Sequence, residues 1–181
     1  MDNKFSSILK RSLRVTADYI TAFILFCVLS ASVFSLARGE TPAFIPWISF
    51  ATFLILFYLV YVDMRNIGFK ENRPQYNLNP SRFKGLLYGA IGVLPVLIIQ
   101  LAVLAVNVPE GYEGLKRRIF QLVSGPLYWI AKILGNEAWH YCATLVSVML
   151  MALLGYLAGH CKFYLTTWLK TTLGTKKESK V

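Results

Sequence analysis

The chain has 181 residues, of which 56% are hydrophobic and only 15% are charged, and its mean hydropathy is +0.52. A typical soluble domain has about 25% charged residues, so this chain has too few to cover a soluble surface. Disorder is excluded as well, because it requires low hydrophobicity and high charge. The composition therefore predicts a single integral membrane domain. The formal net charge of the chain is +10.

The first segment, residues 1–16, has the pattern of an amphipathic helix on the cytosolic membrane surface. Apolar residues recur there at helical spacing, and lysines and arginines form the polar side. Such a helix attracts anionic lipid headgroups through its basic side chains. The candidate lipid or anion contacts in it are Lys10, Arg11 and Arg14. The alternative role is an anchoring lead-in to the first membrane span.

Four apolar runs are predicted to cross the membrane as helices. Each is about as long as the roughly 20 residues that a helix needs to span the hydrocarbon core. None shows the alternating pattern of a membrane β-strand. The predicted spans are residues 17–36, 44–62, 85–106 and 138–159.

The basic residues are concentrated in alternate connections, which predicts the orientation. The segments before residue 15, between the second and third spans (63–84) and after the fourth (160–181) hold 14 of the 19 lysines and arginines. With four spans these segments share one side, and the positive-inside rule makes that side the cytosol. Both termini are therefore expected in the cytosol. Topology accounts for most of the charge, so no nucleic-acid partner is expected.

A fifth hydrophobic stretch, within residues 115–134, is broken at Gly125–Pro126 and carries Lys132. If it crossed the membrane fully, the lysine-rich tail would lie outside, against the charge rule. We predict an outer hairpin of two short helices that re-enters the membrane or lies flat on it, with Pro126 in the first turn of the second helix. The predicted fold class is an all-α integral membrane protein, a four-transmembrane-helix bundle with this outer broken re-entrant or interfacial helical hairpin.

Two pairs of glycines have the GxxxG spacing of helix contacts in membranes. Gly85 and Gly89 open the third span, and Gly155 and Gly159 close the fourth. Because these spans are antiparallel, both pairs lie at the same depth, where small residues let helix backbones approach. The pattern predicts contact between these two spans, with packing on another subunit as the alternative.

Gln100 is the one strongly polar residue deep within a predicted span. Its amide is expected either to bond across helices or to line a polar path. Pro95, five residues earlier, predicts a kink in the same helix. The candidate path lies between the third span and the outer hairpin, and its residues are Gln100, Pro95, Ser124, Gly125 and Tyr128.

No catalytic, metal-binding or cofactor-binding motif is found in the sequence. His140 and His160 are at opposite ends of the fourth span, and the three cysteines have no metal-ligand spacing. Asp18 is expected to pair with Arg14 or to face headgroups. On the outer side, Lys116, Arg117 and Arg118 form a basic run that is a candidate contact for lipid phosphates or an acidic partner, or else a solvated helix face.

Three functions are compatible with this pattern. The favoured one is a non-enzymatic accessory or scaffold subunit that binds membrane lipids, mainly anionic, and a membrane-protein partner or a second copy of itself. The alternative is a transporter or channel component with the path described above. The third is a membrane enzyme acting on lipids, which would have to use the clusters Lys116–Arg118 and Glu137–His140.

Overall fold

The computed structural model describes residues 5–36, 41–73, 81–106, 113–135 and 137–161. Most of the predicted tail 160–181 and part of the 63–84 connection lie outside these ranges. The described residues contain no strand. Their helices are α1 (Phe5–Leu36), α2 (Thr41–Glu71), α3 (Lys84–Ala105), α4 (Glu113–Val123), the short 3₁₀ helix η2 (Gly125–Leu127), α5 (Tyr128–Leu134) and α6 (Ala138–His160).

Four of the described helices, α1, α2, α3 and α6, are long and apolar enough to cross a membrane. They correspond in order to the four predicted spans. A chain with four such helices is a multi-pass membrane protein. The all-helical class and the multi-pass membrane location predicted from composition are therefore confirmed.

Two helices are longer than the predicted spans. Residues 5–16 of the expected surface helix are the first part of α1, which packs on the bundle there through Ile8, Ser12 and Val15, while residues 1–4 lie outside the described residues. Similarly, α2 continues past the predicted end of its span to Glu71, because Met64 and Ile67 extend its buried face by one and two turns. Burial of these side chains stabilises helix where the sequence is otherwise polar.

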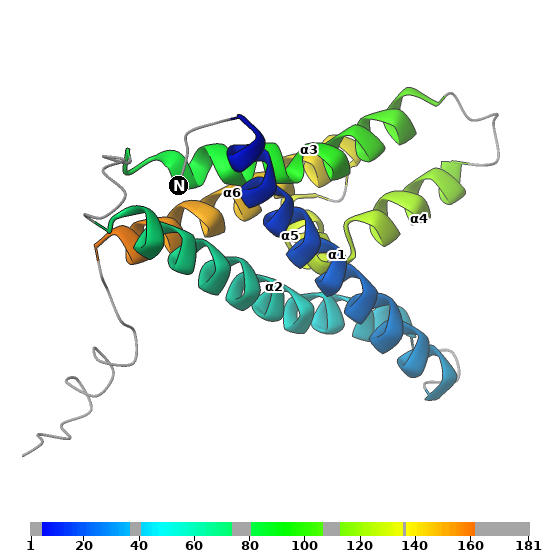
Figure 1. Cartoon of the computed structure of the whole chain (residues 1–181). Coiled ribbons are helices and arrows are strands. Elements are labelled where there is room, and N and C mark those ends of the chain that lie inside the picture. The colour runs from blue at the N-terminus through cyan, green and yellow to red at the C-terminus, as the bar shows by residue number, and fades with distance from the viewer. Residues whose placement is uncertain (1–4, 37–40, 74–80, 107–112, 136, 162–181) are drawn as a thin grey trace, which may run out of the picture.

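Helix α6 is at the centre of the bundle and packs against both α2 and α3, while α1 packs across α2 and α3 (Figure 1). The helices converge where α1 and α3 begin and α2 and α6 end, which we call the Glu71 end. At the opposite end α3 diverges from α1 and α2, and the segment α4–η2–α5 lies between them (Figure 1). The main core cluster includes Val15, Tyr19, Leu56, Val60, Met64, Tyr88, Val93, Val148, Ala152 and Tyr156.

The α3 glycines, Gly85 and Gly89, lie against α6. A Cβ atom added at Gly89 would lie 2.9 Å from Cα of Met149 and 3.0 Å from Cβ of Ala152. A side chain at Gly85 would likewise meet Tyr156. The third and fourth spans are thus in close contact at this depth, and the α3 glycines allow it.

The α6 glycines, Gly155 and Gly159, do not take part in that contact. A Cβ atom at Gly155 would lie 2.7 Å from the carbonyl oxygen of Tyr61, and one at Gly159 would meet the backbone of Arg65, both on α2. The expectation that both glycine pairs serve one interface is therefore wrong. The α6 residues that meet α3 and those that meet α2 project from different faces of the helix.

The broken segment has its turn in the interior of the protein. Ser124, Gly125, Pro126 and Leu127 are all buried, and η2 packs against α1 and α2. Pro126 lies in the first turn of η2, where its missing N–H leaves no hydrogen bond unmade. The surrounding helices therefore hold this turn from several sides.

Candidate functional site

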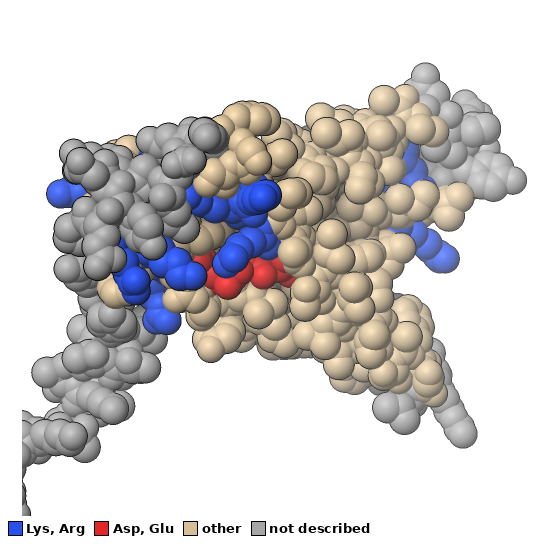
Figure 2. Space-filling model, in the orientation of Figure 1, with Lys and Arg blue, Asp and Glu red and all other residues tan. Residues whose placement is uncertain are grey.

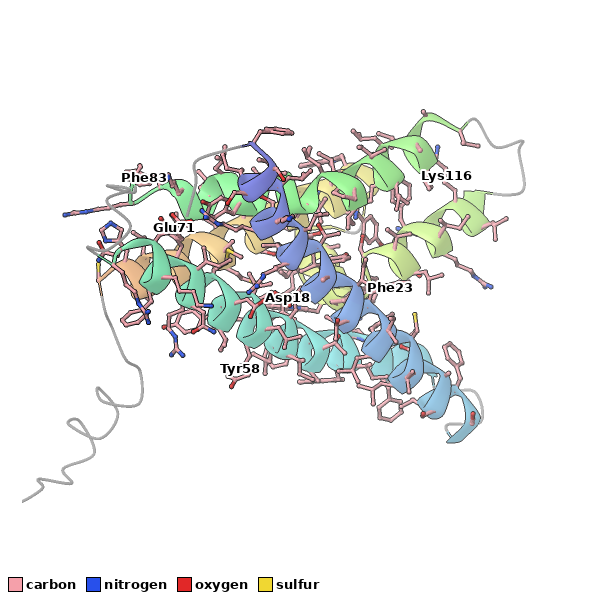
Figure 3. The ribbon with its side chains drawn as sticks, in the orientation of Figure 1. Asp18, Phe23, Tyr58, Glu71, Phe83 and Lys116 are labelled. Atoms are coloured by element: carbon pink, nitrogen blue, oxygen red, sulfur yellow. The ribbon has the colours of Figure 1, made fainter. Side chains whose placement is uncertain are left out.

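The most highly connected polar group in the described part of the chain is the carboxylate of Glu71, the last residue of α2. Its side chain is fully buried at the convergent end of the bundle (Figure 3). The Tyr88 hydroxyl on α3 donates to Oε1 at 2.7 Å, and the Tyr156 hydroxyl on α6 donates to Oε2 at 2.8 Å. The two tyrosine rings pack edge to face, with centroids 5.9 Å apart.

Two cations complete this arrangement. The Arg11 guanidinium on α1 donates to Glu71 and forms an ion pair with it, and Lys84 Nζ on α3 lies 4.0 Å from Oε2. One carboxylate thus receives contacts from the other three membrane-crossing helices. Since charge-assisted hydrogen bonds are among the strongest in proteins, Glu71 stabilises the contacts of α2 with the other three helices.

Arg11 was predicted to contact lipid, but it is only 6% exposed. Its Nη1 is within hydrogen-bond distance of both Glu71 and the Tyr88 hydroxyl, the latter at 3.0 Å. Its Nη2 is also buried, and no hydrogen-bond partner for it is found among the described residues. Arg11 therefore uses one branch of its guanidinium to hold Glu71 and has a second donor group unused.

A basic pocket lies next to this cluster, between the start of α1 and the end of α2. Its volume is about 160 Å³, and it opens to the outside. Figure 2 shows the basic side chains gathered around a small acidic area on this end of the molecule. The residues that line the pocket are Ser7, Lys10, Arg11, Arg14, Ile67 and Lys70.

The acidic groups near the pocket are arranged differently from expectation. Arg14 lies 4.0 Å from Asp63 on α2, at the limit of an ion pair. Asp18 was expected to pair with Arg14 or to face headgroups, yet its Oδ2 is buried and has no hydrogen-bond partner among the described residues. Its carboxylate lies on the side of α1 that approaches α2 (Figure 3). Arg14 is thus weakly paired, with Asp63 at the limit of an ion pair and Asp18 in electrostatic interaction with it.

At the other end of the bundle, the predicted path residues Gln100 and Ser124 meet each other. Gln100 is fully buried, and its Nε2 donates to Ser124 Oγ at 2.9 Å. Gln100 Oε1 has no partner among the described residues. Pro95 is exposed, and Tyr128 packs towards a separate small cluster with Phe120. The structure therefore joins only part of the predicted path.

Other side chains hold the broken segment in place. The Ser49 hydroxyl on α2 donates to the Gly125 carbonyl at 2.7 Å and accepts from the Trp129 backbone N–H at 3.0 Å. The Tyr19 hydroxyl on α1 donates to the Val123 carbonyl at 3.0 Å. These bonds satisfy backbone groups that the break in the helix sets free.

The outer polar clusters have structural partners. Lys116 Nζ donates to the carbonyls of Leu104 and Val106 at 2.8 and 2.9 Å, so it caps the end of α3 (Figure 3). The prediction for Lys116 was a contact with lipid phosphates or an acidic partner, or a solvated helix face. Arg117 and Arg118 are exposed. Glu137 and His140 form a capping box at the start of α6. Lys116, Glu137 and His140 are therefore engaged in capping helices, whereas Arg117 and Arg118 stay at the surface.

No protein-family model matches the chain, and it has no significant match to a curated protein or a solved structure. The Glu71 cluster, the Gln100–Ser124 pair and the basic pocket are therefore the features that indicate a function.

Proposed function

We propose that this protein is a small, non-enzymatic integral membrane accessory or scaffold subunit that binds anionic lipid at its Glu71 end and associates with a membrane-protein partner or a second copy of itself. The surface at the start of α1 carries this proposal. Phe5 and Leu13 are exposed there, and the neighbouring Lys10 and Arg14 are exposed as well. Apolar side chains beside exposed cations suit the boundary between acyl chains and anionic headgroups.

In the proposed orientation the Glu71 end faces the cytosol, as the positive-inside rule predicts. The segment α4–η2–α5 then enters the membrane from the outer side and turns back within the bundle. Support for this re-entrant arrangement comes from its buried turn and from the bonds made by Ser49 and Tyr19. Irregular backbone at membrane depth is stable only where protein or water satisfies it.

The bond between Gln100 and Ser124 favours the accessory function over the transporter alternative. A transport path needs water or substrate beside such groups, whereas these two side chains are fully buried and bond to each other. The transporter alternative still draws support from the unpartnered Gln100 Oε1. It would require the broken segment to move away from Gln100.

Lipid retention tests the proposed function directly. The full-length protein is extracted from vesicles of phosphatidylcholine and phosphatidylglycerol in equal amounts, and the bound lipid is identified by native mass spectrometry. We expect phosphatidylglycerol to be enriched over its bulk fraction. Bound lipid of the same composition as the bulk would refute anionic lipid binding. Chains that co-purify from native membrane in mild detergent would identify the partner.

Orientation is tested separately in a variant whose three native cysteines are replaced by alanine. A cysteine introduced at Lys70 should resist an impermeant thiol reagent in intact cells, and one at Glu113 should react. The reverse labelling pattern would contradict the proposed orientation while leaving the fold unaffected.

A further inference from the structure

We propose that the basic pocket between α1 and α2 is a specific site for a phosphate group, and that a phosphomonoester lipid headgroup is its preferred ligand. This inference rests on the lipid-binding function proposed above and names the chemistry of the site. It concerns one pocket rather than the general attraction of a basic surface to anionic lipid.

The charges around the pocket leave it with a positive excess. Four of its six lining residues are basic: Lys10, Arg11, Arg14 and Lys70. The carboxylates near these residues are Glu71, which pairs with Arg11, Asp63, which lies 4.0 Å from Arg14, and Asp18, which also interacts electrostatically with Arg14. Lys84 Nζ lies 4.0 Å from Oε2 of Glu71 and offsets part of its charge. An anion in the pocket would therefore meet uncompensated positive charge from two helices.

The second guanidinium branch of Arg11 is the feature that points to a specific ligand. Nη2 is buried without a hydrogen-bond partner among the described residues, although Arg11 lines the pocket. A buried donor without an acceptor is unfavourable, so an acceptor supplied by a ligand would be bound strongly. Because Nη1 is fixed by Glu71 and Tyr88, the guanidinium is already oriented before a ligand arrives.

The remaining lining groups suit a phosphate group attached to a lipid. Ser7 adds a hydroxyl, and Lys10 on α1 and Lys70 on α2 each supply an ammonium group. Arginine recognises phosphate oxygens through paired donors, and lysine acts as a point charge. The exposed Leu13 on α1 lies next to this basic face and would contact the acyl chains.

A phosphomonoester fits the charge excess better than a phosphodiester. A monoester carries about −1.5 to −2 charges at pH 7, since its second pKa is about 6, whereas a diester carries a single charge. Phosphatidic acid is therefore expected to bind more tightly than phosphatidylglycerol. The same chemistry occurs in soluble phosphate, which lacks the acyl chains that would rest on α1.

The test measures lipid binding to the full-length protein in phosphatidylcholine nanodiscs that contain either phosphatidic acid or phosphatidylglycerol. The variant Lys10→Gln/Lys70→Gln removes two exposed pocket cations and leaves the Arg11–Glu71 pair intact. We expect it to weaken phosphatidic acid binding roughly 20- to 30-fold, because each cation near a phosphate contributes about fivefold. Arg82→Gln, an exposed cation at the same end but outside the pocket, is the matched control and should change binding by less than about threefold.

Arg11→Lys tests the role of the guanidinium itself. It keeps the charge opposite Glu71 but removes Nη2, so phosphatidic acid should lose its advantage over phosphatidylglycerol. If the variant does not fold, the double lysine variant still decides, because both of its positions are exposed. A wild-type preference for phosphatidic acid in both variants would overturn the proposed site.

Inorganic phosphate distinguishes the two sources of the ligand. Competition only at concentrations far above those of the lipid supports a lipid headgroup. If inorganic phosphate binds at low concentration to a protein that shows no preference for anionic lipid, the phosphate site is retained and the lipid-binding function is refuted. If anionic lipid is enriched but the pocket variants bind it like the wild type, the function stands and the pocket inference fails. Binding of neither probe would refute both.

Discussion

Replacing Glu71 with glutamine tests whether one carboxylate ties the bundle together. The substitution preserves size but removes the charge that balances Arg11, whose side chain is 8% exposed in the structure. Removing one partner of a buried ion pair costs about 3–5 kcal/mol, because the other charge is left without compensation. Glutamine still accepts one hydrogen bond from a tyrosine hydroxyl, and Arg11 borders an open pocket. We therefore expect Glu71→Gln to lower the free energy of unfolding by about 3 kcal/mol, at the lower end of that range.

The free energy of unfolding is measured by titrating the purified protein from mild detergent into mixtures with a denaturing detergent. Arg11→Gln/Glu71→Gln should cost less than the sum of the two single substitutions, because neither charge is then left alone. Asp63→Asn is the control, because Asp63 is half-buried and its distance of 4.0 Å from Arg14 is at the limit of an ion pair. This substitution should lower the free energy of unfolding by less than about 1 kcal/mol. Simple additivity of the double variant, or a loss from Glu71→Gln no larger than that of Asp63→Asn, would refute the reasoning.

Three further predictions concern packing and the opposite end, all measured by the same unfolding titration. Ser49→Ala leaves the Trp129 N–H without its acceptor and should cost about 2 kcal/mol; an unchanged stability would mean that water replaces the hydroxyl. Gly155→Ala should cost about 1–3 kcal/mol because its Cβ would lie 2.7 Å from a backbone oxygen, whereas Gly114→Ala, with nothing within 4 Å, should be neutral or slightly stabilising. Equal effects of the two would contradict the close approach. Gln100→Leu should change stability by less than about 1 kcal/mol, since it removes one bond and one unpartnered oxygen together; a large loss would show that Gln100 has partners besides Ser124.

The membrane class and the four spans could be predicted because they depend on the length and composition of apolar runs. The ends of α1 and α2 could not, because hydropathy falls where these helices leave the apolar runs although their packing continues. A signal was nevertheless present in α2. Val60, Met64, Ile67 and Glu71 recur at helical spacing, which places Glu71 on the buried face that the first three define.

The Glu71 cluster was missed for a related reason. Arg11 was grouped with Lys10 and Arg14 as a basic residue of a surface helix, and Glu71 fell in a segment that looked like a polar loop. Which side of α1 faces the bundle depends on tertiary packing and is not fixed by charge. Tyr88 and Tyr156 did not indicate the cluster either, because a tyrosine in an apolar run contributes to the hydrophobic pattern whether or not its hydroxyl has a partner.

The glycine pairs show the limit of a local motif. GxxxG indicates that a helix backbone can be approached closely, but it does not name the helix that approaches. In α6 the pair Gly155 and Gly159 receives α2, while Ala152 and Tyr156 receive the glycines of α3. The partner was decided by the rotation of α6 between its two neighbours, which depends on all the contacts of the bundle together.

The two ends of the bundle are held by different kinds of bond, and this difference bears on the proposed function. The broken segment is fixed by neutral hydroxyl and amide groups, each of which bonds one or two partners. The Glu71 end instead joins four helices through one carboxylate, and its principal cation, Arg11, also lines the pocket. An anion bound to Nη2 would share the Arg11 guanidinium with Glu71, so its effect would reach α2, α3 and α6 through a single side chain. A lipid headgroup in the pocket is thus placed to alter the packing of the whole bundle, whereas a change at the broken segment would be divided among independent bonds.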